Sequence, residues 1–286
     1  MASLKEVKNR ILSVEGTKKI TVARQMISSA RLRQSQGILE KVSRYQKELA
    51  RVMASLTDPQ KPFSHPLTEV RDNGPVALVV MASNSGMCGS FNAKMVKELS
   101  NLPTHYPNEQ VLFFPIGKKI PPHIHRHTLP VQGDYNVLAD KFSFDQAAHF
   151  VDHLIDLFRT QKIKKADLLF YHNKSAATQI ITYRPLLPFS LPEPNPSTIT
   201  EEADLYIYEP SRQAILESML PQVIKSLFYV TLADHHTAEH AARTLAMQLA
   251  SENANDILEE LRLSYNKLRQ QNITAELLDI IGGSFA

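Results

Sequence analysis

The sixty residues from Gln222 to Ile281 contain neither glycine nor proline, the two residues that most disfavour a helix interior. A continuous helix of this length would measure on the order of 90 Å at ~1.5 Å per residue. An ordinary globular helix has only ~11 to 12 residues, so this one needs a partner along most of its length. The stretch therefore predicts a very long helix that pairs with another helix.

Apolar or small residues recur in this stretch at the sevenfold spacing of a coiled coil. Two neighbouring rows carry them: Ala254, Leu261, Leu268 and Ala275 in one, and Ala250 and Ile257 in the other. The second row becomes polar at Ser264 and Gln271. The C-terminal end of the helix is therefore expected to contact something besides its partner helix.

The partner helix is predicted at the other end of the chain, because residues 3–56 lack proline and repeat apolar residues at steps of three and four. The repeat comprises Leu4, Val7, Ile11 and Val14, and later Ile38, Val42, Tyr45, Leu49, Val52 and Leu56. Pro59 ends the helix, since the residue before a proline avoids helical geometry. Through residue 51 this helix carries twelve Lys or Arg against four Glu. Such a basic helix has either a solvated face or a surface for acidic protein or nucleic acid.

Between the two helices the pattern changes to alternating strands and helices. Strands are predicted at Val76–Ala82, Val111–Gly117, Ala166–His172 and Thr178–Tyr183, and helices at Ala93–Asn101 and Phe144–Gln161. This alternation is typical of a doubly wound, Rossmann-like α/β domain with a mostly parallel sheet. Ser211 can cap the C-terminal helix, and Pro221 predicts a kink before its long part.

The predicted fold class is therefore α/β, with a long antiparallel two-helix coiled coil from the two termini and an inserted doubly wound domain. The N-terminal helix is expected within residues 1–58, the inserted domain within 76–209, and the C-terminal helix within 211–286. A hydrophobic fraction of 43% and a net charge of +3 argue against both a disordered chain and a polyelectrolyte. The single cysteine excludes an intramolecular disulfide, and we expect neither a membrane span nor a targeting peptide.

Motifs for catalysis are weak. Gly86 and Gly89 follow a predicted strand, but neither the P-loop nor the dinucleotide-binding fingerprint is present. Cys88 has no evident base near it in sequence and is expected to be a packing residue.

Two groups of histidines occur in the sequence, of which the first has the spacing of metal ligands. His123, His125 and His127 alternate, which in a strand would direct three imidazoles to one face, although the prolines before them favour an exposed loop. The other group, His235, His236 and His240, is expected on the polar face of the long helix. We therefore predict no catalytic residue, cofactor or resident metal.

Several segments, spread from end to end, resemble the γ subunits of F-type ATP synthases. Residues 273–284, ITAELLDIIGGS, resemble the family pattern I-T-x-E-[LM]-x-E-I-[VI]-x-G-A, with departures at Asp279 and Ser284. Residues 261–270 and 239–243 are similar to L-x-L-x-Y-N-K-x-R-Q and E-x-x-A-R. Residues 11–21 resemble I-x-S-V-x-N-T-x-K-I-T, with Gly16 in place of Asn. Residues 83–92 resemble S-D-R-G-L-C-G-x-x-N, with Asn84 and Ser85 in place of Asp and Arg.

The resemblance implies a non-catalytic rotor shaft of the F1 (CF(1)) part, which couples proton or sodium transport to ATP synthesis or hydrolysis. Its implied partners are the α and β subunits of the catalytic hexamer, the ε subunit and the c-ring. By position in the motifs, the implied β-subunit contacts are Arg269, Gln270, Thr274 and Glu276, with Arg24 where the family often has Met. The implied contacts to the c-ring or ε are Tyr206 and Glu209.

The implied location is peripheral, on the cytoplasmic face of a bacterial membrane or, alternatively, on the matrix side of the mitochondrial inner membrane. Two other classes of protein stay open on the residues alone. One is a coiled-coil scaffold that binds nucleic acid or acidic protein, and the other is a nucleotide-dependent enzyme built on the α/β domain. Neither has a motif in its support.

Overall fold

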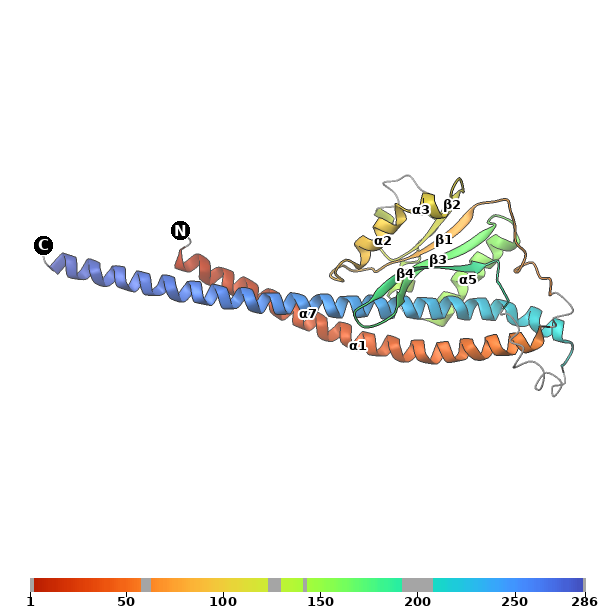
Figure 1. Cartoon of the computed structure of the whole chain (residues 1–286), viewed down its shortest axis with the longest axis horizontal. Helices are drawn as coiled ribbons and strands as arrows, with labels where there is room; N and C mark the ends of the chain where they lie inside the picture. The colour runs from red at the N-terminus through yellow and green to blue at the C-terminus, as the bar shows by residue number, and fades with distance from the viewer. Residues whose placement is uncertain (1–2, 58–62, 123–129, 141–142, 192–207, 285–286) are drawn as a thin grey trace. The chain divides into compact units, whose positions relative to one another are not determined.

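The computed structural model describes residues 3–57, 63–122, 130–140, 143–191 and 208–284 (Figure 1). The chain forms two compact units. The first combines the residues up to Ala30 with those from Arg243 onward, and the second contains Arg31–Ala242. Helix α1 (Leu4–Leu56) and helix α7 (Arg212–Ser284) each continue through both units, with 53 and 73 residues. Among the described residues, no helix is both long and apolar enough to cross a membrane.

In the first unit, the α1 and α7 segments run antiparallel and each buries one seam (Figure 1). Buried or half-buried side chains on α7 recur at alternating steps of four and three: Met247, Ser251, Ala254, Leu258, Leu261, Tyr265 and Leu268. The seam of α1 follows the same rule: Leu4, Val7, Ile11, Val14, Lys18, Thr21, Gln25 and Ser28. An ion pair between Arg262 and Glu15, 3.0 Å long, joins the two segments. The predicted coiled coil is confirmed.

The predicted α7 seam is wrong at Ile257 and Ala275, which are exposed. Ala254 is only 6% exposed, but Ile257 is 46% exposed, while its neighbour Leu258 is 5% exposed. Ala275 is also exposed. A sevenfold repeat can proceed from Ala254 by a step of three or of four, and both steps reach an apolar residue here. Only the packing against α1 selects Leu258.

The second unit contains a four-stranded sheet in the order β2-β1-β3-β4. Its strands are β1 (Val76–Met81), β2 (Val111–Ile116), β3 (Lys165–Asn173) and β4 (Gln179–Leu187). Strand β1 runs parallel to β2 and β3, whereas β4 pairs antiparallel with β3. The other helices are α2 (Phe91–Leu99), α3 (Leu102–His105), the short 3₁₀ helix η1 (Asn136–Ala139) and α5 (Phe144–Arg159). The predicted mostly parallel sheet is confirmed.

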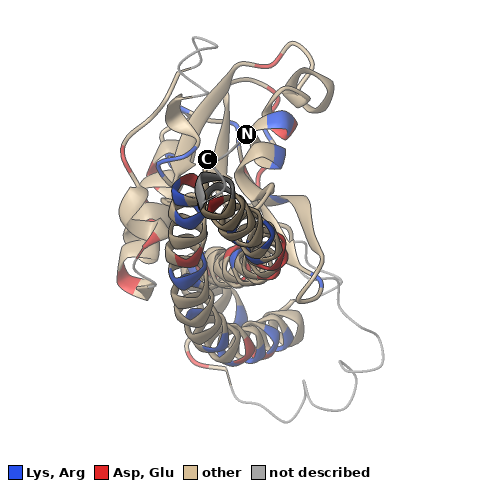
Figure 2. Ribbon diagram, turned by 90° about the vertical axis from the view of Figure 1, so that its left-hand side faces the viewer, with Lys and Arg blue, Asp and Glu red and all other residues tan. Residues whose placement is uncertain are grey.

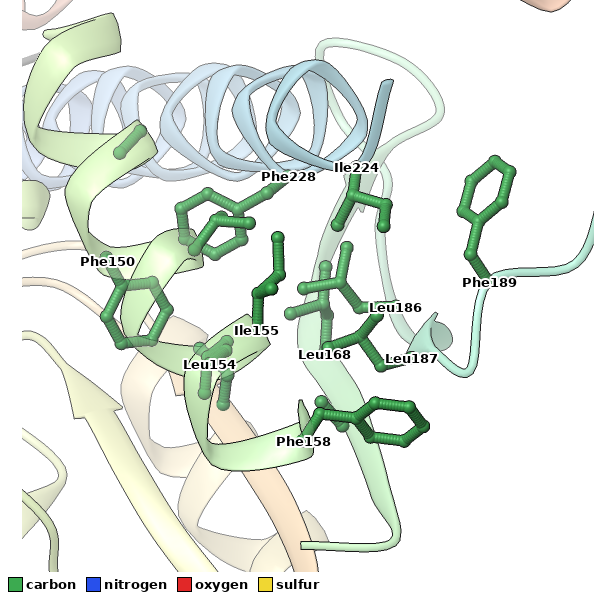
Figure 3. Packing of buried hydrophobic residues seen from close by; sticks show 14 of the residues in the cluster. Phe150, Leu154, Ile155, Phe158, Leu168, Leu186, Leu187, Phe189, Ile224 and Phe228 are labelled. Carbon is green, nitrogen blue, oxygen red and sulfur yellow. The ribbon is translucent and has the colours of Figure 1, made fainter. Parts of the chain in front are cut away.

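Both faces of the sheet are covered, because β1 is apolar at every position and alternate residues face opposite sides. Val76, Leu78 and Val80 pack with Phe91 and Met95 of α2. On the other face, α5 and α7 converge on the sheet, and Figure 3 shows side chains of both helices meeting there. The labelled residues include Phe150, Leu154 and Phe158 of α5, Ile224 and Phe228 of α7, and Leu168 and Leu186 of the sheet. The arrangement is the predicted doubly wound domain.

Helix α7 begins before the stretch that is free of glycine and proline. The hydroxyl of Ser211 accepts a hydrogen bond from the Ala214 amide at 3.2 Å, which confirms the predicted cap. The helix then continues through Pro221, which is half-buried. Pro221 therefore lies inside α7 and does not mark its beginning.

The middle of α7 is enclosed, and every residue from Thr231 to Ala241 is buried. The expectation that His235, His236 and His240 lie on a polar, solvated face is therefore wrong, since they are 1%, 4% and 8% exposed. Polar residues this deeply buried need partners. The Tyr171 amide donates to Nδ1 of His235 at 3.2 Å, and Nε2 of His236 lies 2.9 Å from the Leu138 carbonyl.

His235 is held in its neutral form. Because Nδ1 accepts a hydrogen bond, the neutral ring carries its proton on Nε2. Burial, together with the neighbouring rings of His236 and His240, lowers the pKa of His235 to about 3, against a smaller opposite effect of the Ala82 carbonyl.

We expect this histidine to make the fold sensitive to mild acid. The pKa of His235 is lower in the folded chain than the ordinary ~6.5, so the unfolded chain binds more protons as the pH falls below that value. The group should remove about 1.4 kcal/mol of stability between pH 7.5 and 5.5. Urea unfolding at the two pH values should show this loss in the wild type and a smaller loss in His235→Gln. An equal loss in both proteins would contradict the assignment.

The corrected seam makes a second prediction. Leu258→Ala should lower the free energy of unfolding by ~2–4 kcal/mol, because it removes a buried side chain from the coil. The adjacent Ile257→Ala serves as the control and should change it by less than about 0.5 kcal/mol. Helix content followed during urea unfolding measures both, and equal effects would argue against the observed seam.

Candidate functional site

The carboxyl edge of the sheet is the first place to look for a small-molecule site. In doubly wound domains ligands bind where successive strands are added to opposite sides of the first one. Here that point lies between β1 and β3, because β2 and β3 flank β1 on opposite sides. The Tyr171 and Asn173 amides of β3 donate there to His235 and to Oδ1 of Asp234, at 3.2 and 2.9 Å. Helix α7 therefore occupies the position of a ligand.

The loop after β1 uses its polar groups to hold its own shape. The side-chain amide of Asn92 donates to the hydroxyl of Ser83 at 2.8 Å and to the sulfur of Cys88 at 3.2 Å. The Asn84 side chain donates to the Asn136 carbonyl and accepts from the Lys118 amide, both at 2.9 Å. Asn84, one of the two departures from the family pattern, thus connects this loop to η1 and to the loop after β2. Cys88 is 2% exposed, which agrees with a packing role.

A buried acid and phenol lie toward the other end of β3. Asp167 is 3% exposed and accepts a hydrogen bond of 2.7 Å from the hydroxyl of Tyr106. The ammonium of Lys165 lies 2.8 Å from the same carboxylate. Burial, reinforced by the bond to Asp167, raises the pKa of Tyr106, so the phenol stays protonated. Both contacts reach the same carboxylate oxygen of Asp167, and together they fasten the end of α3 to β3.

The described residues contain no group of three or more His, Cys, Asp or Glu that could hold a metal ion. The candidate ligands His123, His125 and His127 lie outside the described residues. A hollow of about 350 Å³ lies beside α5, with a mostly apolar lining that includes Tyr135, Phe150 and His153. It offers no pairing of a nucleophile with a base.

The predicted β-subunit contacts are on the surface of the first unit. Arg269, Gln270, Thr274 and Glu276 are all exposed on α7, and the Thr274 hydroxyl donates to the Gln270 carbonyl at 2.9 Å. Arg24 is exposed on α1. Of the residues expected to meet the c-ring or ε, Glu209 is exposed and Tyr206 lies outside the described residues.

The ion pair between Glu15 and Arg262 sets the register of the two segments. In an antiparallel pair this register places Arg24 beside α7 residues near 253, roughly 24 Å along the helix from Arg269 at ~1.5 Å per residue. The structure therefore separates Arg24 from the other four predicted contacts. The same register places Leu4 opposite residues near 273, so α7 continues past the start of α1 (Figure 1).

Apolar side chains on the end of α7 were missed by the reasoning from sequence, which considered only polar residues there. From Arg269 to Ile281, every side chain that the structure describes is exposed. Five large apolar ones form what we call the terminal apolar band: Ile273, Leu277, Leu278, Ile280 and Ile281, at 49%, 54%, 63%, 69% and 52% exposure. Exposed apolar groups gathered in this way mark an interaction surface. The signal was present in the aliphatic positions of the 273–284 motif.

Basic residues on α1 do not form a continuous track. Eleven of the twelve Lys and Arg residues through residue 51 are exposed, and Lys18 is half-buried. Figure 2 shows basic positions interspersed with acidic and uncharged ones along the long helices. This distribution gives no support to a nucleic-acid scaffold.

Comparison with known proteins adds independent evidence. The model of the family described as "ATP synthase" matches residues 3–286. The ATP synthase gamma chain of Parabacteroides distasonis is 41% identical over 286 residues, covering 99% of both chains. That of Phocaeicola vulgatus is 39% identical over 289 residues, covering 100% of both.

Solved structures agree on the fold. A chain in the mitochondrial ATP synthase of Euglena gracilis, in an assembly of OSCP, F1 and c-ring, aligns with a TM-score of 0.68 at 18% identity. The alignment covers 99% of this chain and 93% of that one. A chain from the central stalk and c-ring of the Tetrahymena thermophila enzyme aligns with a TM-score of 0.57 over 81% of this chain and 99% of that one. Together with the identity to the bacterial relatives over the full length, these findings show that the chain belongs to the ATP synthase family, as one of its gamma chains.

Proposed function

We propose that this gamma chain is the central rotor stalk of an F-type ATP synthase, transmitting torque between the membrane c-ring and the catalytic α3β3 hexamer. Ion transport is thereby coupled to ATP synthesis or hydrolysis, and catalysis belongs to the β subunits. One observation carries the proposal: α7 is an unbroken helix that belongs to both the α/β domain and the coiled coil. In the domain it fills the position where a ligand would bind, and in the coil it ends in exposed side chains. Such a molecule is suited to mechanical contact.

The division of labour follows from the kind of side chain at each surface. The terminal apolar band can contact a surrounding ring of subunits without fixed hydrogen bonds, since apolar contact is not directional. Arg269, Gln270, Thr274 and Glu276 supply directional contacts to a β subunit, and Arg24 supplies a separate charge farther along the coil. Because a turning shaft presents these groups to each β subunit in turn, it can favour a different nucleotide affinity in each.

Tyr206 and Glu209 are proposed to meet the c-ring or the ε subunit. The division into an N-terminal helix (1–58), an inserted domain (76–209) and a C-terminal helix (211–286) belongs to the same proposal. The relatives that support it are bacterial, which favours a peripheral protein on the cytoplasmic face of the cell membrane over the matrix side of a mitochondrion.

The experiment is reconstitution. The full-length chain is combined, in vesicles, with the other F1 subunits and the complete membrane sector, including the c-ring, of an ATP synthase from a bacterial relative. Assembly on α and β and ATP-driven ion uptake that requires this chain would support the proposal. Failure to bind α or β, under conditions in which the relative's own gamma chain binds, would overturn it.

A variant tests the β-subunit contact. Arg269→Ala should lower ion uptake per ATP hydrolysed by about twofold or more, because a hydrogen bond to a charged group contributes ~1.5–3 kcal/mol. The isolated variant should stay folded, since Arg269 is exposed. The control is Lys267→Ala, a nearby exposed cation, which should leave the ratio of uptake to hydrolysis unchanged. If Arg269→Ala behaves like this control, Arg269 makes no such contact.

A further inference from the structure

The edge of β3 that faces β1 is longer than β1 can cover. Strand β1 ends at Met81, and its last pair with β3 is Val80 with Leu169. Residues two apart in a strand present their backbone groups to the same edge. The Tyr171 and Asn173 amides therefore face this edge beyond the end of β1, where a further strand would supply acceptors.

Helix α7 supplies these acceptors from its side chains. Nδ1 of His235 accepts from the Tyr171 amide at 3.2 Å, and Oδ1 of Asp234 accepts from the Asn173 amide at 2.9 Å. The other carboxylate oxygen of Asp234 lies 2.6 Å from Nδ1 of His172. Two adjacent side chains of a helix thus continue the hydrogen-bond ladder of a sheet.

Further polar contacts attach the same part of α7 to three other elements. Arg184 of β4 donates to the hydroxyl of Thr231 at 2.9 Å. Nε2 of His236 lies 2.9 Å from the Leu138 carbonyl of η1, and Lys225 forms an ion pair of 2.7 Å with Asp152 of α5. We call Thr231, Asp234, His235 and His236 the polar band. All four are at most 6% exposed.

A helix that packs on a sheet through apolar side chains alone resists separation but has little to fix its rotation and sliding, because apolar attraction is proportional to area and has no direction. Hydrogen bonds weaken steeply when distance or angle departs from the optimum. A set of buried bonds to several different elements therefore fixes both the rotation of α7 about its axis and its position along it.

We propose that the polar band is a register clamp through which torque passes between the α/β domain and α7. This inference rests on the proposed function and deepens it. Asp234 and His235 are its main positioning residues, because they hold the backbone of β3 itself. The clamp stands where other doubly wound domains bind ligands, so the ligand position has become a mechanical joint.

The test uses the double variant Asp234→Ala/His235→Leu, which removes both acceptors. In the isolated full-length chain, amide hydrogen exchange at Tyr171 and Asn173 should accelerate by about tenfold or more, while amides that bond β3 to β4 keep their protection. In the reconstituted complex, ATP hydrolysis should continue, and ion uptake per ATP hydrolysed should fall by about twofold or more.

Two further variants separate register from stability. Val223→Ala, at a fully buried apolar position of the same helix, weakens packing without removing a polar contact and should leave the ratio of uptake to hydrolysis unchanged. Asp234→Asn retains an oxygen acceptor for Asn173 and should restore most of the coupling. If the double variant does not fold, Thr231→Val takes its place and should lower the ratio by a smaller factor. It removes the contact with Arg184 and, within α7, the bond of the Thr231 hydroxyl to the Leu227 carbonyl.

If the double variant keeps the wild-type ratio of ion uptake to ATP hydrolysis, the proposed clamp is wrong. It is also wrong if Val223→Ala lowers this ratio as much as the double variant does. If Thr231→Val is used instead, a wild-type ratio of uptake to hydrolysis likewise contradicts the clamp. These results differ from failure of the proposed function, in which the wild-type chain itself would neither bind α and β nor support ion uptake.

Discussion

The second unit depends on the enclosure of the middle of α7. A helix buried on every side for about three turns has no solvated face, so its polar groups must find partners inside the protein. The partners it finds are backbone amides at the exposed end of β3, an arginine of β4 and a carbonyl of η1. The apolar contacts of α5 and α7 with the sheet provide the bulk of the stabilisation, and the polar contacts determine which residues face which.

The elements of this fold could be predicted from sequence because each carries a strong local pattern. The apolar run at Val76–Ala82, the alternation of strands and helices, and the three- and four-residue steps of the termini all correspond to observed elements. The choice between Ile257 and Leu258 could not be made, because adjacent apolar residues satisfy the same period. The burial of His235 could not be foreseen either, since local polarity predicts exposure and only the packing of distant elements encloses it.

Of the exposed surface at the end of α7, the polar residues could be predicted from sequence and the apolar ones were not. Arg269, Gln270, Thr274 and Glu276 were identified through the family motif, and they are exposed as a contact surface requires. The aliphatic residues of the terminal apolar band, most of which follow Glu276, were overlooked, because a periodic pattern treats such residues as core. The α/β domain shows the limit of inference from fold. Its fold binds nucleotides in many enzymes, but here a helix fills the ligand position at the carboxyl ends of β1 and β3. Function in such a chain is decided at the site and cannot be read from the fold.

The terminal apolar band also has a consequence for how the chain is made. Five exposed aliphatic side chains on one short helical segment would cause newly synthesised copies to adhere to each other or to chaperones. Unassembled copies are therefore prone to aggregation, whereas copies with a bound partner are not. Synthesis of this chain should be matched in amount to the subunits that cover the band, and its incorporation should precede any accumulation of the unassembled form.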